Sequence, residues 1–276
     1  MKKSSQVAVV ITAMLAVLLL VALSTSVSLP AATRFLASFD LRWPFQERFE
    51  CLSLSYTTEI ISLDPLLIYI HGFLSPQEIA GILAAGEDRF EPSTVYRNGE
   101  LIQNPYRTSS SAGLPDDDPA VSCILGRARK FLGATLDPVA DEMGIPQLVR
   151  YTQGQHYDLH RDWLRVPQQA FDGSARVFNR PASFFAILQD NCTDGETWFP
   201  FVEPVRPRDR GELWRRHEEG GLAFKPVAGN ALFWVNLFAN NTGDDRTIHA
   251  GLPVTGGLKT ALNIWPRKYW DSIDPE

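Results

Sequence analysis

Apolar residues follow two different patterns along this chain, and the change falls near residue 147. Before it, segments 75–85 and 119–143 carry apolar residues at helical spacing, preceded by a short strand-like run at 66–70. After it, short apolar runs alternate with turn residues, which predicts strands at 149–152, 182–188, 221–225, 231–237 and 260–264. The two patterns predict a mainly β fold with N-terminal helices. Its expected core is an antiparallel jelly-roll, a cupin-like double-stranded β-helix.

Capping and breaking residues mark the ends of the two predicted helices. Ser75 stands in a capping position, Pro76 at the first helical position and Glu78 at the third, a combination that favours a helix start. This helix is expected to end near residue 85. In the second segment, Gly133 or Pro138 is expected to break the helix.

The N-terminus carries a separate, almost purely apolar run from Val7 to Leu23, interrupted by Thr12. Its length is at the short end of a membrane-spanning helix, which takes about 17–25 residues. It is longer than the apolar part of a typical cleavable signal, about 7–15 residues. Lys2 and Lys3 precede the run and favour a cytoplasmic N-terminus, with the rest of the chain in the lumen.

The predicted organisation is therefore a transmembrane signal anchor at 1–28, a stem at 29–64 and a folded domain at 65–270. Such a chain is a single-pass type II membrane protein whose folded domain lies in the endoplasmic reticulum or the secretory pathway. A cleaved signal peptide is the alternative, because residues 28–32 offer a processing site. The protein would then be secreted.

Two sequons and three cysteines bear on this compartment. Asn191 and Asn240 each begin an Asn-x-Thr tripeptide in turn-rich surroundings, so both are candidates for N-glycosylation in a lumenal protein. Cys51, Cys123 and Cys192 allow at most one internal disulfide, and their spacing does not select the pair. They form no C-x-x-C motif, which excludes a zinc ribbon and a dithiol redox site.

Composition narrows the class of protein further. The chain has 276 residues, 45% of them hydrophobic, which is enough for one folded domain with an N-terminal appendage. Its net charge of −6 provides no general basic surface for a polyanion. Nucleic acid is therefore not expected as a partner.

Candidate metal ligands lie at two distant places along the chain, outside the strands predicted above. His160 and Asp162 are two residues apart, so on an extended strand both side chains project from the same face. With His249 from a later strand they would provide two imidazoles and one carboxylate, the ligand set of non-haem Fe(II) sites that leave positions open for a cosubstrate and dioxygen.

Spacing alone leaves other ligand sets open. His156 and Asp158 repeat the same His-x-Asp frame four residues upstream. His156 and His160 have the i, i+4 spacing of a helical zinc pair, although the nearby Gly154 and the missing general-base Glu argue against that interpretation.

Four blocks of sequence, in order, resemble the prolyl 4-hydroxylase-like Fe(II)/2-oxoglutarate-dependent dioxygenases. The resemblance covers about residues 65–268. The blocks are Tyr151-x-x-Gly154-Gln155-x-Tyr157-x-x-His160-x-Asp162, then Gly195-Glu196-Thr197-x-Phe199-Pro200, then Gly221 to Trp234, and finally His249-x-Gly251-x-Pro253-Val254-x-x-Gly257-x-Lys259 followed by Trp265.

The resemblance implies a role for each matched residue. His160, Asp162 and His249 would be the iron ligands, which selects the frame of His160 and Asp162 over that of His156 and Asp158. Lys259 would pair with the distal carboxylate of 2-oxoglutarate, and Tyr151 is the candidate hydroxyl donor to the same molecule. Because Asp162 is present, hydroxylation rather than halogenation is expected. Dioxygen would be consumed, with ascorbate as the reductant.

The expected activity is hydroxylation of an unactivated C–H bond, with release of succinate and carbon dioxide. A peptidyl proline is the predicted substrate. Hydroxylation of a small molecule, such as a secondary metabolite, is the alternative, and a non-catalytic jelly-roll binding module is a third interpretation. Arg161 and Arg165 beside the iron motif are either substrate contacts or solvated residues of a strand edge, and Thr197 is a candidate pocket residue.

Overall fold

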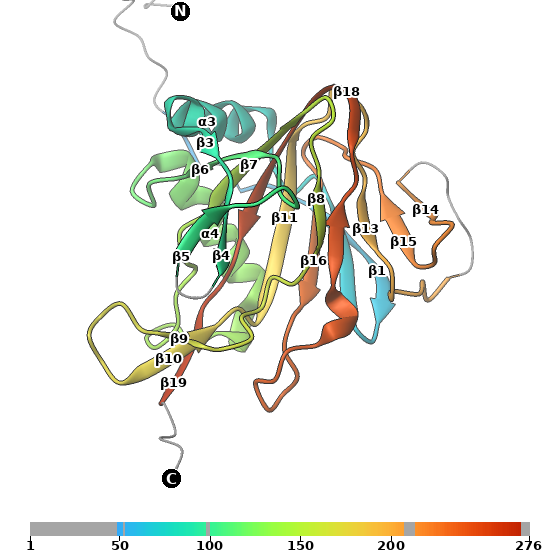
Figure 1. The fold of residues 1–276 in the computed structure, drawn as a ribbon. Coiled ribbons are helices and arrows are strands. Elements are labelled where there is room, and N and C mark those ends of the chain that lie inside the picture. The colour runs from blue at the N-terminus through green and yellow to red at the C-terminus, as the bar shows by residue number, and fades with distance from the viewer. Residues whose placement is uncertain (1–48, 52, 98–99, 207–212, 272–276) are drawn as a thin grey trace, which may run out of the picture. The chain divides into compact units, whose positions relative to one another are not determined.

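The structure is a computed structural model that describes residues 49–271 except 52, 98–99 and 207–212 (Figure 1). These residues form one compact unit. The predicted signal anchor at 1–28 and most of the predicted stem lie outside the described residues. Among the residues that are described, no helix has the length and apolar character needed to cross a membrane.

A large antiparallel sheet forms the centre of the unit. Eight of its strands pair in one continuous path. In order across the sheet they are β1 (Thr57–Leu63), β2 (Leu66–His71), β16 (Ala231–Val235), β11 (Ala182–Gln189), β18 (Val254–Ile264), β7 (Gln147–Thr152), β6 (Ser110–Gly113) and β3 (Glu91–Pro92). A short strand, β12 (Cys192–Asp194), pairs with β18 off this path. Neighbours distant in sequence, such as β7 and β18, thus lie side by side.

A smaller antiparallel sheet faces one side of the large one. Its strands, in order, are β14 (Trp214–Arg216), β15 (Leu222–Phe224), β13 (Thr197–Phe199), β17 (His249–Gly251) and β8 (Tyr157–His160). Aromatic and aliphatic side chains from both sheets, among them Phe185, Phe199 and Trp234, fill the space between them. The predicted mainly β, jelly-roll-like fold is confirmed.

The opposite face of the large sheet is covered by two helices, α3 (Pro76–Gly86) and α4 (Pro119–Leu132), as Figure 1 shows. Strand β11 packs against the helices with one face and against the smaller sheet with the other. Phe184 and Ala186 pack in the cluster that includes the helices, whereas Phe185 and Ile187 pack toward the smaller sheet. Because side chains alternate along a strand, an almost continuous apolar run is needed here.

Both helices begin as their sequences predict. Ser75 and Glu78 form a capping box at the start of α3, with Pro76 in the first turn. Helix α4 starts after Asp118, whose side chain accepts hydrogen bonds from two backbone amides. It ends at Gly133, which has a positive φ of 55°. Of the two predicted breakers, Gly133 is therefore the one that ends the helix.

The folded unit begins before residue 65, where the predicted domain started. Strand β1 pairs with β2 along residues assigned to the stem. The side chain of Ile61 on β1 is buried in the core between the sheets, and its carbonyl accepts a hydrogen bond from Val205 N. The sequence did not predict strand β1, because the polar residues in this segment obscure the alternating apolar pattern.

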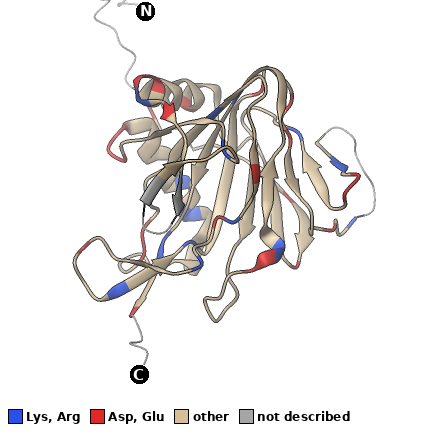
Figure 2. Ribbon diagram, viewed as in Figure 1, with Lys and Arg blue, Asp and Glu red and all other residues tan. Residues whose placement is uncertain are grey.

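Acidic and basic residues are interspersed over the whole fold (Figure 2).

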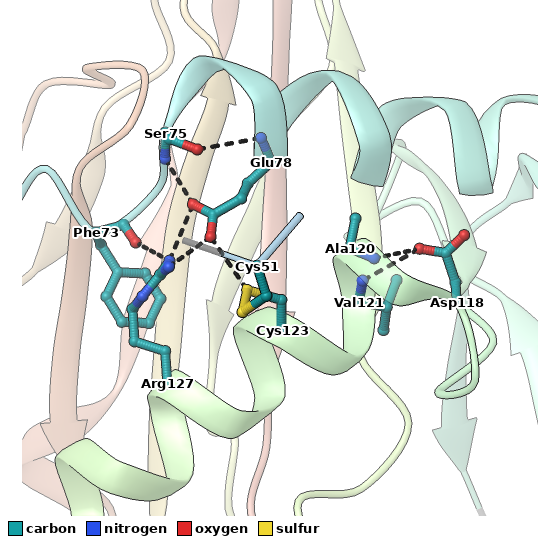
Figure 3. Close-up of a disulfide and its surroundings, with 9 residues drawn as sticks. All are labelled: Cys51, Phe73, Ser75, Glu78, Asp118, Ala120, Val121, Cys123 and Arg127. Atoms are coloured by element: carbon teal, nitrogen blue, oxygen red, sulfur yellow. Dashed lines mark hydrogen bonds and ion pairs between the residues drawn. A yellow bond between two sulfur atoms is a disulfide. The ribbon is translucent and has the colours of Figure 1, made fainter. Parts of the chain in front are cut away.

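A disulfide and a buried ion pair fasten the helical layer (Figure 3). Cys51 is bonded to Cys123 on α4, whereas Cys192 is a free thiol, so the pairing that the sequence left open is Cys51 with Cys123. Nearby, Arg127 of α4 forms an ion pair with Glu78 of α3 and donates a 2.7 Å hydrogen bond to the Phe73 carbonyl. Burial raises the pKa of Glu78, but the bonds from Arg127 and Ser75 outweigh it and lower this pKa overall.

Candidate iron and cosubstrate site

Two imidazoles and one carboxylate meet at the edge of the smaller sheet. His160 at the end of β8 is the register partner of His249 on β17, and Asp162 follows two residues after His160. The Nε2 atoms of His160 and His249 each lie 3.9 Å from a different oxygen of Asp162. One ligand atom from each residue lies within 4.8 Å of the others, so a single cation can contact all three.

Backbone carbonyls orient both imidazoles toward that cation position. His160 Nδ1 donates to the Asp158 carbonyl at 2.7 Å, and His249 Nδ1 donates to the Thr247 carbonyl at 3.0 Å. Each ring therefore carries its proton on Nδ1 and turns the lone pair of Nε2 toward Asp162. Burial, with the neighbouring His249, lowers the pKa of His160 to about 3. The neutral form needed for metal ligation is thus favoured.

Two buried polar side chains position Asp162. Ser183 Oγ donates to Asp162 Oδ2 at 2.7 Å, and Asn236 Nδ2 donates to Ser183 Oγ at 2.9 Å. Arg180 Nη1 donates to the Asp162 carbonyl at 3.2 Å. Burial raises the pKa of Asp162, but the neighbouring His249 and His160 and the Ser183 bond lower it on balance. The carboxylate is therefore held ionised, as a ligand of a cation must be.

Aromatic rings enclose the two histidines. The ring of Tyr157 stacks on His160 with centroids 3.5 Å apart, and those of Phe199 and Trp234 lie 5.1 and 4.8 Å from the centroid of His249. These rings restrict the motion of the imidazoles and keep water from their sides.

The other His-x-Asp frame lies apart from this cluster. His156 Nε2 pairs with Asp158 at 3.4 Å, and half of the Asp158 side chain is exposed to solvent. The helical zinc pair is also excluded, because His160 lies on strand β8 and His156 in the connection between β7 and β8.

Lys259 and Tyr151 face each other across the pair of strands β18 and β7. The Lys259 side chain is 1% exposed, and its Nζ donates to the Gly195 carbonyl at 2.6 Å. The ammonium also lies 5.4 Å from the ring centroid of Tyr151 and 5.2 Å from that of Phe185. Burial lowers the pKa of Lys259 to about 8 and raises that of Tyr151 to about 12.

A cavity of about 980 Å³ opens over the three metal-ligand candidates. The buried residues Tyr151, Phe185 and Thr197 are part of its lining, so Lys259 contacts the rings of two lining residues. Trp163 and Trp265 line it as well, whereas Trp198 and Trp234 do not. Arg161 and Arg165, for which the sequence left two interpretations, both line the cavity, together with Arg107 and Arg180.

The sequence patterns did not point to Ser183, Asn236, Arg107 or Arg180. Ser183 lies inside a predicted buried strand, where a polar residue between apolar neighbours could have signalled a bonded group at the site. Arg107 and Arg180 lie in loops whose path over the site depends on the tertiary fold.

Comparisons with known proteins agree with this geometry. A family model described as the 2OG-Fe(II) oxygenase superfamily matches residues 146–267, which contain all three ligand candidates and Lys259. The chain is 28% identical over 240 residues to prolyl 4-hydroxylase 1 of Arabidopsis thaliana, covering 86% of this chain and 81% of that protein. It is 31% identical over 212 residues to prolyl 4-hydroxylase subunit alpha-3 of Rattus norvegicus, covering 76% and 35%.

Solved structures support the fold. The viral collagen prolyl hydroxylase vCPH from Paramecium Bursaria Chlorella virus-1, in its 2OG complex, gives a TM-score of 0.53 at 22% identity, over 73% of this chain and 96% of that one. Together the comparisons identify the chain as a prolyl 4-hydroxylase-like 2OG oxygenase. It is a dioxygenase whose cofactors are Fe(II) and 2-oxoglutarate, as predicted. It spans about a third of the length of the rat alpha subunit that it matches.

Proposed function

We propose that this dioxygenase hydroxylates a peptidyl proline, with Fe(II) bound by His160, Asp162 and His249. The observation that carries the proposal is the cluster of these three side chains, two of them buried, at a large cavity, in a chain similar to proteins named prolyl 4-hydroxylases. When bound, iron and 2-oxoglutarate supply the oxidising chemistry that hydroxylates a C–H bond and releases succinate and carbon dioxide.

Lys259 and Tyr151 are suited to bind 2-oxoglutarate. With a pKa of about 8, Lys259 is mostly protonated at neutral pH and can pair with the distal carboxylate, for which a point cation is sufficient. In forming that pair its ammonium would exchange the Gly195 carbonyl for a carboxylate oxygen. Tyr151 keeps its proton throughout the physiological range and can donate a hydrogen bond.

The cavity walls are compatible with a proline ring. Tyr157, Trp163 and Trp265 present aromatic surfaces, and the Arg180 guanidinium stacks on the Trp265 ring at 4.1 Å. Such surfaces hold an apolar ring by contact area and exclude water from the reacting carbon. Retention of every ligand candidate, together with Lys259, argues against the non-catalytic interpretation.

A small-molecule substrate remains the second candidate, favoured by one observation. The cavity volume of about 980 Å³ falls at the upper end of the range of ligand pockets, roughly 300–1,000 Å³. A metabolite could therefore be enclosed in it without a peptide chain extending outside.

We also propose that the catalytic unit works in the lumen of the secretory pathway, attached by the N-terminal anchor or secreted after its cleavage. The Cys51–Cys123 disulfide supports an oxidising compartment. The candidate glycosylation residues Asn191 and Asn240 are both exposed. Glycosidase sensitivity and protease protection of the full chain in microsomes test this location.

The activity is tested by supplying full-length protein with Fe(II), 2-oxoglutarate, ascorbate and a proline-rich peptide, and measuring succinate and hydroxyproline. His160→Ala should abolish both products, and Lys259→Ala should raise the KM for 2-oxoglutarate. His156→Ala is the matched control from the other His-x-Asp frame and should retain activity. Failure of the parent protein to bind Fe(II), or equal losses in both histidine variants, would contradict the proposal.

A further inference from the structure

The cavity has an unusual concentration of positive charge for an acidic protein. Among its described lining residues, Asp162 is the only carboxylate, whereas the guanidinium groups belong to Arg107, Arg161, Arg165 and Arg180. The chain as a whole carries a net charge of −6, and its charges are otherwise interspersed (Figure 2). A cleft lined by one sign of charge concentrates ligands of the opposite sign.

The cofactors do not account for these arginines. The two carboxylates of 2-oxoglutarate and that of Asp162 together match the charge of Fe(II) plus that of Lys259. With iron and cosubstrate bound, the inner site is therefore close to neutral. The arginines of the lining therefore remain as excess positive charge at the cavity, except for Arg161, which is paired with Asp245.

Two of the four are held deep in the site by other contacts. Arg107 donates to the Thr94 carbonyl at 3.0 Å and to Gln147 Oε1 at 2.9 Å. Arg180 is bound to the Asp162 carbonyl. Their orientation is fixed by the protein, so they add charge to the field without adapting to a side chain.

The other two lie at the rim. Arg161 forms an ion pair with Asp245, which neutralises most of its charge. Arg165 is exposed, and it makes no hydrogen bond or ion pair within the part of the chain that the structure describes. It lies close enough to Asp245 to help lower the pKa of that carboxyl, although the Arg161 hydrogen bond has the larger effect. Arg165 is thus the guanidinium available to a ligand.

We infer that Arg165 binds an aspartate or glutamate side chain close to the target proline and makes the enzyme prefer acidic peptides. The inference rests on the proposed peptidyl-proline activity. Of the two interpretations that the sequence left open for Arg165, it selects the substrate contact. A planar guanidinium suits this task because it can bind both oxygens of a carboxylate.

The test uses three peptides that share one target proline and differ at the neighbouring position, which is Glu, Gln or Lys. Full-length protein with Fe(II) and 2-oxoglutarate should show a kcat/KM for the Glu peptide roughly two- to fivefold above that for the Gln peptide, the range of an exposed ion pair. The Lys peptide should be the poorest. The preference should shrink as ionic strength rises, because salt screens exposed charges.

Variants then locate the preference. Arg165→Gln should remove the difference between the Glu and Gln peptides, and Arg165→Glu should shift it toward Lys. Arg216→Gln is the matched control, because Arg216 is an exposed arginine on β14 outside the cavity lining. It should keep the preference of the parent protein. Equal kcat/KM for Glu and Gln, or a preference that survives Arg165→Gln, would overturn the inference.

A binding measurement separates this inference from the proposed function. The dissociation constants of the same peptides, fluorescently labelled, are measured by anisotropy with Mn(II) and 2-oxoglutarate present. In one outcome, no peptide is hydroxylated, but the Glu peptide binds more tightly and Arg165→Gln removes that difference. The role of Arg165 in binding acidic side chains then stands, and the peptidyl-proline activity fails. If instead the peptides are hydroxylated but bind with equal affinities, the activity stands and the role of Arg165 fails.

Discussion

Ser183 and Asn236 form a buried chain of hydrogen bonds that ends at an oxygen of Asp162. Both side chains are fully buried, and Asn236 Oδ1 has no partner among the described residues. Such partners of metal ligands fix the orientation in which the ligand meets the ion. These hydrogen bonds therefore extend the site beyond the three candidate iron ligands.

Ser183→Ala should weaken Fe(II) binding about 10- to 100-fold, because loss of a residue that orients a metal ligand typically lowers metal affinity by that factor. Anaerobic titration with Fe(II), followed by isothermal calorimetry, measures the change. Ser122→Ala removes an exposed serine on α4 and should leave the affinity as it is. Unchanged affinity in Ser183→Ala would show that Asp162 is held well enough without this bond.

Lys259 should give 2-oxoglutarate binding a pH dependence. Its pKa, lowered by burial to about 8, means that the ammonium loses its charge as pH rises through 8, well below the range of an ordinary lysine. The KM for 2-oxoglutarate should be constant below about pH 7.5 and rise by up to about tenfold per pH unit above 8. Lys259→Met should have a high KM without this dependence. A flat profile in the parent protein would contradict the assignment.

At the scale of elements, the site depends on two short strands that the smaller sheet brings together. β8 and β17 have four and three residues, and their pairing places His160 opposite His249. Strands this short contain too few residues to show an alternating pattern. Their histidines stand out through motif resemblance, whereas the strands themselves were not predicted.

The helical layer is joined by the Glu78–Arg127 pair, which should matter strongly for stability. Arg127→Met should lower the free energy of unfolding by about 3–5 kcal/mol, because it leaves the Glu78 carboxylate buried without its cation. Urea denaturation with the disulfide intact measures this loss. Lys130→Met, an exposed change on the same helix, should alter it by less than about 0.5 kcal/mol. Similar values for the two variants would contradict this account of the pair.

At the scale of the whole molecule, the long periodic segments were predictable. The capping box of α3 and the strands around Phe184 and Trp234 follow from local pattern. Strands that form only by pairing with another strand were not predictable from their own sequence. Residues 57–63 form β1 because β2 supplies their hydrogen bonds, and Trp214–Arg216 form β14 because β15 does.

The same limit on prediction from local sequence applies to the candidate site. His160, Asp162, His249 and Lys259 stand in motifs, so the sequence could nominate them, and the fold brings the three ligand candidates together. The residues that hold or surround them, such as Ser183 and Arg180, come from other segments. Their roles depend on which side chains the rolled sheet places next to one another.

The alternation along β11 has a consequence for protein engineering. Ser183 and Phe185 face the site side, and Phe184 and Ala186 face the helices, so inserting one residue within the strand would exchange the two sets. A benzyl group would then point toward Asp162, and a hydroxyl toward the helices. Changes of length in this enzyme should therefore be placed in the exposed turn at 171–175, where no buried layer depends on the count.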